Sequence, residues 1–182
     1  MRFSVTLGAA GDARDPAALA DLAALAEAAG WDAFLLEDYL SYRGLATYDP
    51  WVCLAAIAAA TTRIRLGATV TPLPRRLPWE LAAQAVAVDH LSGGRLILGV
   101  GSGAADDPAL TAVGTPTTAP DRAAQLDEGL DVLTACGPGQ PCITRDAGTA
   151  STGCSCPPRR CSNPESPSGS AVICAARESA AG

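Results

Sequence analysis

Short apolar runs alternate with longer amphipathic segments along the first 135 residues. The runs have the length of buried strands, and the segments have the length and spacing of helices. The pattern predicts four strands, at residues 2–8, 33–37, 64–70 and 95–100. It predicts a helix after each strand, at residues 16–30, 50–61, 78–91 and 121–135.

Local signals mark where two of these helices begin. Asp15 precedes Pro16, and Asp49 precedes Pro50. Aspartate is a favoured N-cap, and proline is favoured at the first helical position. Four repeats of strand and helix predict an α/β fold, in which helices cover a parallel sheet. The pattern alone does not distinguish an open doubly wound sheet from a (β/α)₈ barrel.

The composition changes abruptly after residue 135. Six of the seven cysteines lie beyond it, in a stretch crowded with proline, glycine and serine. Such a stretch cannot bury a core of its own, so we expect a half-barrel domain at 1–135 and a disordered tail at 136–182. Cys154 and Cys156 are too close for a zinc pair, and no histidine is near them, so we expect no metal site.

Charge and hydropathy exclude several classes of protein. The formal net charge is -6, which argues against nucleic-acid binding. No apolar run is long enough for a membrane span, and the first residues do not have the pattern of a secretory signal. We therefore expect a cytoplasmic protein without a membrane partner. His90, near the end of the third helix, is interpreted as structural.

Three pieces of sequence occur in a characteristic order: Asp49-Pro50, LGATVTPLP at 66–74 and DHLSGGRLILGVGSG at 89–103. Over residues 1 to about 135 the chain resembles the luciferase-like monooxygenase family. The resemblance implies the first four units of a (β/α)₈ TIM barrel and a flavin-dependent oxidoreductase, in particular a monooxygenase. It implies FMN, or alternatively a deazaflavin, as cofactor, and a small-molecule substrate with oxygen.

Active sites in such barrels lie at the carboxyl ends of the strands. The resemblance therefore implies Glu37 and Asp38 as catalytic residues and Tyr39 as a substrate-binding residue. The cofactor-binding residues that it implies are Thr69, Val70, Gly101 and Ser102. The family often has a cis peptide bond at the position that matches Thr69-Val70. It often has Glu-His-His where this chain has Glu37-Asp38-Tyr39, so Asp38 would act as the acid or base in place of an imidazole.

In some members a basic residue stands where this chain has Ser102, which can offer the cofactor only a neutral hydrogen bond. The neighbouring pair Arg75-Arg76 either is solvated or faces a phosphate, and we favour solvation.

The tail permits a second interpretation at the level of codons. Read one frame over, the codons of residues 135–139, 148–153 and 161–171 permit LWSG, YRVDG and QQPRIPVWVG. Family members continue after the fourth helix with similar segments in that order. We therefore hypothesise a frameshift near codon 135, in which case the cysteines of the tail carry no selected chemistry.

Two alternatives to a flavin enzyme stay open. The run Gly99–Ala104 also fits G-x-G-x-x-A, the phosphate fingerprint of a Rossmann-type nicotinamide-dependent dehydrogenase. The chain could instead be a non-catalytic relic half-barrel. Half a barrel leaves open strand edges and an uncovered apolar face, which favour a homodimer or aggregation.

Overall fold

The computed structural model describes residues 1–9, 14–42, 45–104, 107–116, 118–136, 142–145 and 172–176. A parallel sheet of six strands forms the centre of this part, in the order β1-β2-β5-β6-β8-β7. Its strands are β1 (Ser4–Gly8), β2 (Ala33–Glu37), β5 (Arg65–Pro72), β6 (Leu96–Gly101), β7 (Cys142–Arg145) and β8 (Val172–Ala176). A separate antiparallel pair consists of β3 (Ser41–Tyr42) and β4 (Leu45–Ala46).

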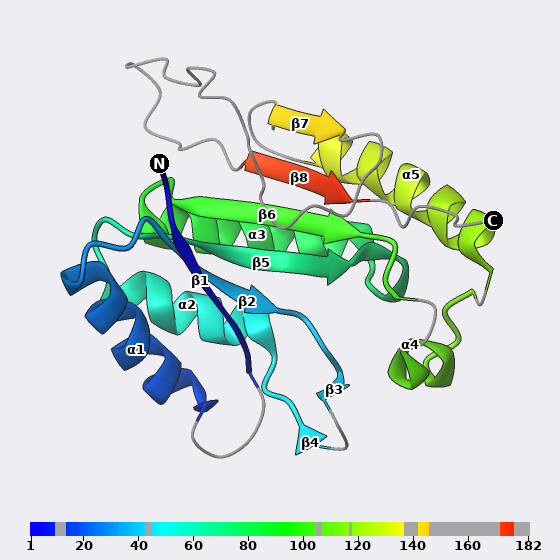
Figure 1. Ribbon diagram of the computed structural model, residues 1–182. Helices are drawn as coiled ribbons and strands as arrows, with labels where there is room; N and C mark the ends of the chain where they lie inside the picture. Colours follow the sequence, from blue (N-terminus) through cyan, green and yellow to red (C-terminus); the bar gives the residue numbers. More distant parts are fainter. Residues whose placement is uncertain are drawn as a thin grey trace.

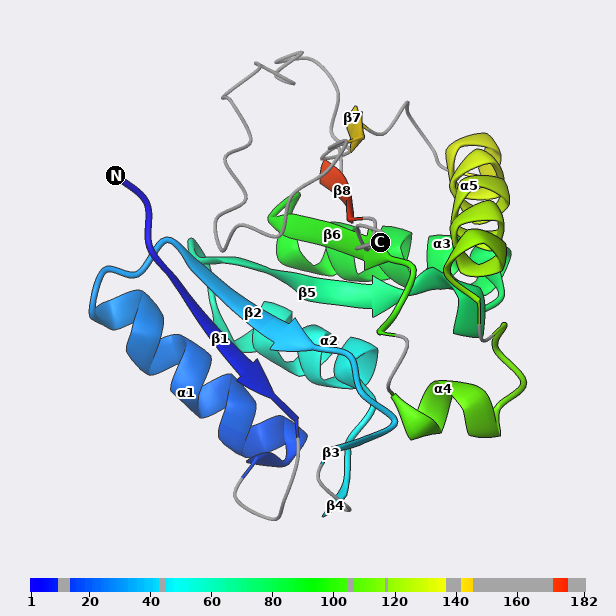
Figure 2. The ribbon, with the colours of Figure 1, turned by 45° about the vertical axis from the view of Figure 1, so that its right-hand side comes forward.

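Helices cover one face of the sheet (Figures 1 and 2). They are α1 (Pro16–Ala28), α2 (Pro50–Ala60) and α3 (Pro78–Ser92), with α5 (Ala119–Cys136) packed against α3 and the 3₁₀ turn η2 (Leu73–Arg75). A further short helix, α4, spans Pro108–Ala112. The core lies between the sheet and these helices and includes Leu19, Phe34, Leu36, Leu54, Ile57, Leu66, Leu81, Leu98 and Leu126.

The order of the strands distinguishes between the two α/β architectures that the sequence left open. The strands β1, β2, β5 and β6 lie side by side in chain order. A doubly wound sheet reverses its order at a switch point near its centre, whereas a (β/α)₈ barrel adds each new strand on the same side. These four units therefore have the arrangement of the first half of a barrel, as predicted.

All four predicted strands and all four predicted helices are present, with ends shifted by a few residues. The short elements α4, β3 and β4 were not predicted. Neither were β7 and β8, because the tail at 136–182 shows no strand pattern. Yet β8 pairs with the free edge of β6, from Ile97 opposite Val172 to Gly101 opposite Ala176. Apart from Cys136, β7 and β8, the predicted tail lies outside the described residues.

The predicted helix caps are confirmed. The Asp15 carboxylate accepts a hydrogen bond from the Ala18 amide at 2.8 Å. The Asp49 carboxylate accepts from the amides of Trp51 and Val52 at 2.9 and 3.0 Å. Each carboxylate thus satisfies N–H groups that the first turn of a helix leaves without partners.

Two charged side chains hold the amino-terminal end of β5. The Glu27 carboxylate accepts hydrogen bonds from the amides of Thr62, Arg63 and Ile64, at 2.6 to 3.2 Å. The Arg95 guanidinium donates to the carbonyls of three residues that end α2 or follow it, at 2.8 to 3.0 Å, namely Ala58, Thr61 and Ile64. This end of a barrel is associated with stability rather than with catalysis.

Candidate functional site

The carboxyl ends of β2, β5 and β6 lie at the same edge of the sheet (Figure 1). In the ladder Leu36 is opposite Ala68, and Pro72 is opposite Gly101. Glu37 therefore ends β2 beside the residues that follow Ala68, and Ser102 follows β6 at the same edge. The fold thus brings the predicted site residues of three strands to a common region.

The pairing of β5 with β6 is irregular within this region. The peptide bond between Thr69 and Val70 is cis, as the family resemblance implied. The register shifts between Ala68 and Thr71. Opposite the irregularity, a Cβ on Gly99 would lie 2.3 Å from the Ala68 carbonyl oxygen. Only glycine allows the two backbones to approach so closely.

Buried hydroxyl groups gather beside this irregular pairing. The Oγ1 atoms of Thr69 and Thr71 are buried and have no hydrogen-bond partner in the described protein. Ser102 is also buried. A buried polar atom without a partner costs free energy. The hydroxyls of β5 therefore favour a ligand that carries hydrogen-bonding atoms, which fits the polar ring of a flavin or a deazaflavin.

Glu37 and Tyr39 are half-buried at the end of β2. A Cβ on Gly8 would lie 3.4 Å from the Glu37 carboxylate, so this carboxylate lies beside the end of β1. The backbone carbonyl of Tyr39 accepts a hydrogen bond from the Thr47 hydroxyl at 2.6 Å. This hydrogen bond joins the segment that follows β2 to the segment that precedes the N-cap of α2.

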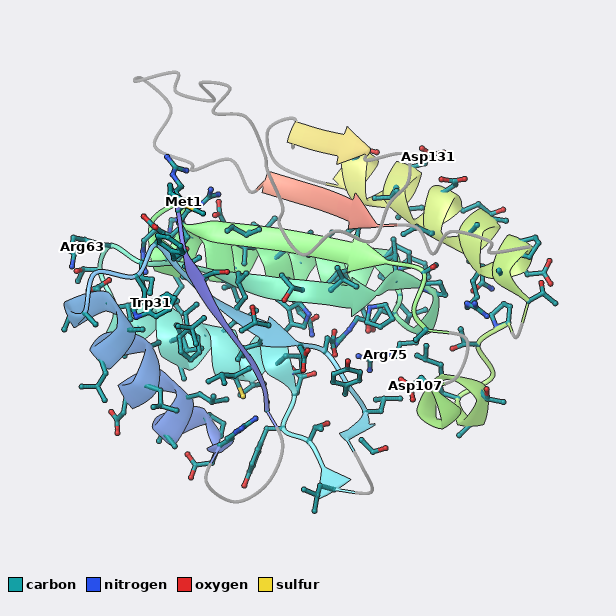
Figure 3. All side chains as sticks on the ribbon, viewed as in Figure 1. Met1, Trp31, Arg63, Arg75, Asp107 and Asp131 are labelled. Atoms are coloured by element: carbon teal, nitrogen blue, oxygen red, sulfur yellow. The ribbon has the colours of Figure 1, made fainter. Side chains whose placement is uncertain are left out.

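Asp38 is fully buried and bound by two arginines. The Arg75 guanidinium donates to the Asp38 carboxylate and, at 2.8 Å, to the Asp38 backbone carbonyl. The Arg76 Nε and Nη2 atoms donate to the two carboxylate oxygens at 3.0 Å each. Arg75 lies near the carboxyl ends of β2 and β5 (Figure 3). Our expectation that this arginine pair is solvated was wrong, because Asp38 provides a buried counter-ion.

Thr71, Arg75 and Arg76 are the residues of this region that sequence reasoning missed or misjudged. The available signal was two adjacent arginines shortly after a buried strand, with an acidic residue at the end of the preceding strand. Strand ends of neighbouring βα units meet in space. Charge complementarity between them could therefore have been predicted once the strand order was assumed.

Cys53 does not contribute a nucleophile to the site. Its side chain is buried in α2. Burial, together with the charges of Asp49 and Asp15, raises the pKa of the Cys53 thiol to about 11. Since the thiolate is the reactive form, this cysteine is inert near neutral pH.

The family model for luciferase-like monooxygenases matches residues 1–173. The chain belongs to the luciferase-like monooxygenase family. The match extends beyond residue 135, where we expected the resemblance to end. Membership also argues against the Rossmann alternative. Residues 102–104 leave β6 without opening a helix, and α4 begins only at Pro108.

Two characterised relatives illustrate the range of this luciferase-like family. The chain is 49% identical over 55 residues to 4-hydroxyprotoasukamycin monooxygenase of Streptomyces nodosus subsp. asukaensis. This match covers 30% of the chain and 15% of the relative. It is 34% identical over 122 residues to an F420-dependent glucose-6-phosphate dehydrogenase of Kineococcus radiotolerans. That match covers 65% of the chain and 36% of the relative. These matches therefore span at most about a third of the relatives' own length.

A solved structure agrees with the fold. The monooxygenase RslO1 of Streptomyces bottropensis superposes with a TM-score of 0.63 at 27% identity, over 74% of this chain and 42% of that one. Both FMN and the deazaflavin F420 occur among relatives and structural neighbours of this luciferase-like chain. Within the part that the structure describes, no helix is both long and apolar enough to cross a membrane.

Proposed function

We propose that this chain forms the amino-terminal half of a flavin-dependent oxidoreductase, in particular a monooxygenase. Its cofactor is FMN, with F420 as the alternative, and its substrates are a small organic molecule and oxygen. The observation that carries the proposal is a pair of buried hydroxyls at the end of β5, Thr69 and Thr71, which have no hydrogen-bond partner among the described residues. They lie at the edge of the sheet where barrels of this kind bind their ligands.

Six of the seven predicted site residues have a role in this proposal, and Asp38 is the exception. Thr69 and Val70 lie beneath the cofactor ring, and Gly101 and Ser102 bind the cofactor beside it. Gly99 adds no side chain beside them, where β5 and β6 approach closely. The cofactor supplies the redox chemistry when it is bound, and the protein contributes binding, orientation and the exclusion of water.

Glu37 is the proposed proton carrier of the site, and Tyr39 contacts the substrate. The Glu37 carboxylate is half-buried and ends β2 at the sheet edge where the cofactor is proposed to bind. Asp38 was predicted to share this role, but its carboxylate accepts hydrogen bonds from two guanidinium groups. These hydrogen bonds occupy both carboxylate oxygens and the side chain is fully buried, so Asp38 is poorly placed to exchange a proton with a substrate.

Titration of the purified chain with oxidised FMN and with F420 tests the proposal. Fluorescence of each cofactor should be quenched or shifted on binding with one cofactor per chain, and the stronger binder identifies the cofactor class. Thr71→Val, which removes the hydroxyl while keeping a similar shape, should weaken binding by roughly tenfold. Thr111→Val, on the exposed surface of α4, is the matched control. Binding of neither cofactor would rule the proposal out.

A non-catalytic relic is the second candidate. The observation in its favour is that Asp38, at a position where the family often has a histidine, is bound by two arginines instead of facing a substrate. Barrels commonly hold a cofactor phosphate with loops after the seventh and eighth strands, and the described residues include only the first four barrel units. This candidate predicts no cofactor binding, together with self-association through the open edges of the sheet.

The frameshift hypothesis for residues 136–182 is tested on the gene itself. Resequencing the region around codon 135 and its downstream DNA should reveal a reading frame that continues the barrel. An uninterrupted gene without such a continuation in the alternate frame would refute it.

A further inference from the structure

Four ionic side chains, Asp38, Asp49, Arg75 and Arg76, join three parts of the candidate site. Asp38 directly follows β2, and Arg75 and Arg76 lie in the connection from β5 to α3. The side chains of Asp38, Arg75 and Arg76 are 0%, 5% and 15% exposed respectively. Arg76 also lies 3.6 Å from the Asp49 carboxylate, which caps α2. The network therefore ties the end of β2, the start of α2 and the segment after β5 together.

Among the described residues, the Arg75 side chain keeps a donor without a partner. The Nη2 atom of Arg75 is used by Asp38, but its Nε atom is buried and has no hydrogen-bond partner in the described protein. Arg75 follows Thr71, whose hydroxyl is also buried and unpartnered, by four residues. An unpaired buried N–H of a charged group is costly. A ligand oxygen that accepted from it would remove that cost.

We propose that Asp38 is a positioning residue rather than a proton carrier. Through its carboxylate and carbonyl it holds Arg75, so that Arg75 Nε donates a hydrogen bond to an oxygen of the bound cofactor. Arg76 also binds this carboxylate, through both of its oxygens. The contact with the cofactor rests on the proposed function, whereas the restraint of the segment after β5 does not.

Two measurements test the proposal: cofactor affinity and backbone hydrogen exchange. Asp38→Asn and Arg75→Lys should each weaken the affinity for FMN or F420 by roughly tenfold, because either change removes or misplaces the Nε donor. Arg75→Lys keeps the charge that pairs with Asp38, so it guards against a variant that fails to fold. The double variant should be weaker than either single variant by less than about threefold, because both changes remove the same interaction.

The control variant is Asp32→Asn, which alters a carboxylate that accepts from the Phe3 amide at the opposite end of β2. It should bind the cofactor as the unaltered chain does. Unchanged cofactor affinity in Asp38→Asn, together with lost turnover, would identify Asp38 as a proton carrier and overturn the proposal. Additive losses in the double variant would also overturn it.

Hydrogen exchange separates this proposal from the proposed function. The Arg76 amide donates to the Leu73 carbonyl at 3.0 Å. In Asp38→Asn, and not in Asp32→Asn, its exchange should accelerate by roughly tenfold or more, since local opening becomes easier. If the chain bound neither cofactor, the proposed function and the Arg75 contact would both fail. Unchanged exchange at Arg76 would refute the positioning role of Asp38 in either case.

Discussion

At the scale of single residues, the charged groups of this chain divide between the two ends of the sheet. Glu27 and Arg95 bind backbone groups around the start of β5, whereas Asp38 binds two arginines beyond its end. Groups at the amino-terminal end satisfy backbone donors and acceptors that would otherwise lack partners. We therefore expect their removal to affect stability and leave cofactor binding unchanged.

Glu27 makes stability depend on acid pH. Burial raises the pKa of the Glu27 carboxyl, but hydrogen bonds from Ile64, Arg63 and Thr62 outweigh it and lower that pKa from 4.5 to about 2. A lowered pKa in the folded state means that the stabilisation is complete above about pH 4.5 and is lost as the pH falls towards 2. Glu27→Gln should therefore reduce the free energy of unfolding by about 1 kcal/mol at pH 7.

The measurement is urea denaturation of both proteins at pH 7 and near pH 2. The difference between Glu27→Gln and the unaltered chain should shrink at the lower pH. Asp21→Asn changes an exposed carboxylate of the same helix, α1, and serves as the control. A difference that is the same at both pH values would contradict the assigned role of the Glu27 charge.

At the scale of elements, the pairing of β5 with β6 shapes the floor of the site. Glycines make this pairing feasible. A Cβ on Gly67 would lie 2.0 Å from the Ile97 carbonyl oxygen, as close an approach as that at Gly99. Local propensity does not favour glycine within a strand, so these positions are explained by the neighbouring backbone.

Gly99→Ala should destabilise the fold, because the methyl group would press on the Ala68 carbonyl. We expect a loss of about 1–3 kcal/mol in the free energy of unfolding, the usual range for overpacking. Gly8→Ala, at the end of β1, places its methyl group 3.4 Å from the Glu37 carboxylate, an ordinary contact. It should change stability by less than about 0.5 kcal/mol. Equal effects of the two substitutions in urea denaturation would refute this account.

At the scale of the whole molecule, the two faces of the sheet differ. Side chains that point to the helices, such as Phe34 and Leu98, are almost completely buried. Their neighbours Leu35 and Ile97, which belong to one row across the ladder, are only half-buried. No helix of the described part covers that second face (Figure 2), and within the same part β1 pairs with a strand on one side only.

We therefore expect the chain to associate with itself through the β1 edge. Sedimentation velocity over a range of concentrations should show dimers or larger species. Thr6→Lys places a charge on an exposed position of β1 and should weaken association roughly tenfold, or by about 1.4 kcal/mol. Thr111→Lys makes the same change on α4, away from this edge, and should have little effect. A chain that stays monomeric at every concentration would exclude association through β1.

The sequence by itself determined the family, together with the four main strands and the four main helices of the first 135 residues, but not the short elements β3, β4 and α4. Apolar runs and caps such as Asp15 and Asp49 are local signals, because strand burial and helix capping depend on neighbours along the chain. It also indicated which strand ends carry the site, since parallel strands end at a common edge.

Only the tertiary structure decided which partner each charge meets. Asp38 and Arg75 lie 37 residues apart in the chain, and nothing local reveals that one neutralises the other. The pairing of β8 with β6 was likewise invisible, because an open strand edge binds backbone groups of any sequence. Thr71 became a candidate ligand contact only because its buried hydroxyl has no partner in the part of the chain that the structure describes. Contacts between distant segments depend on three-dimensional proximity, which side-chain periodicity does not encode.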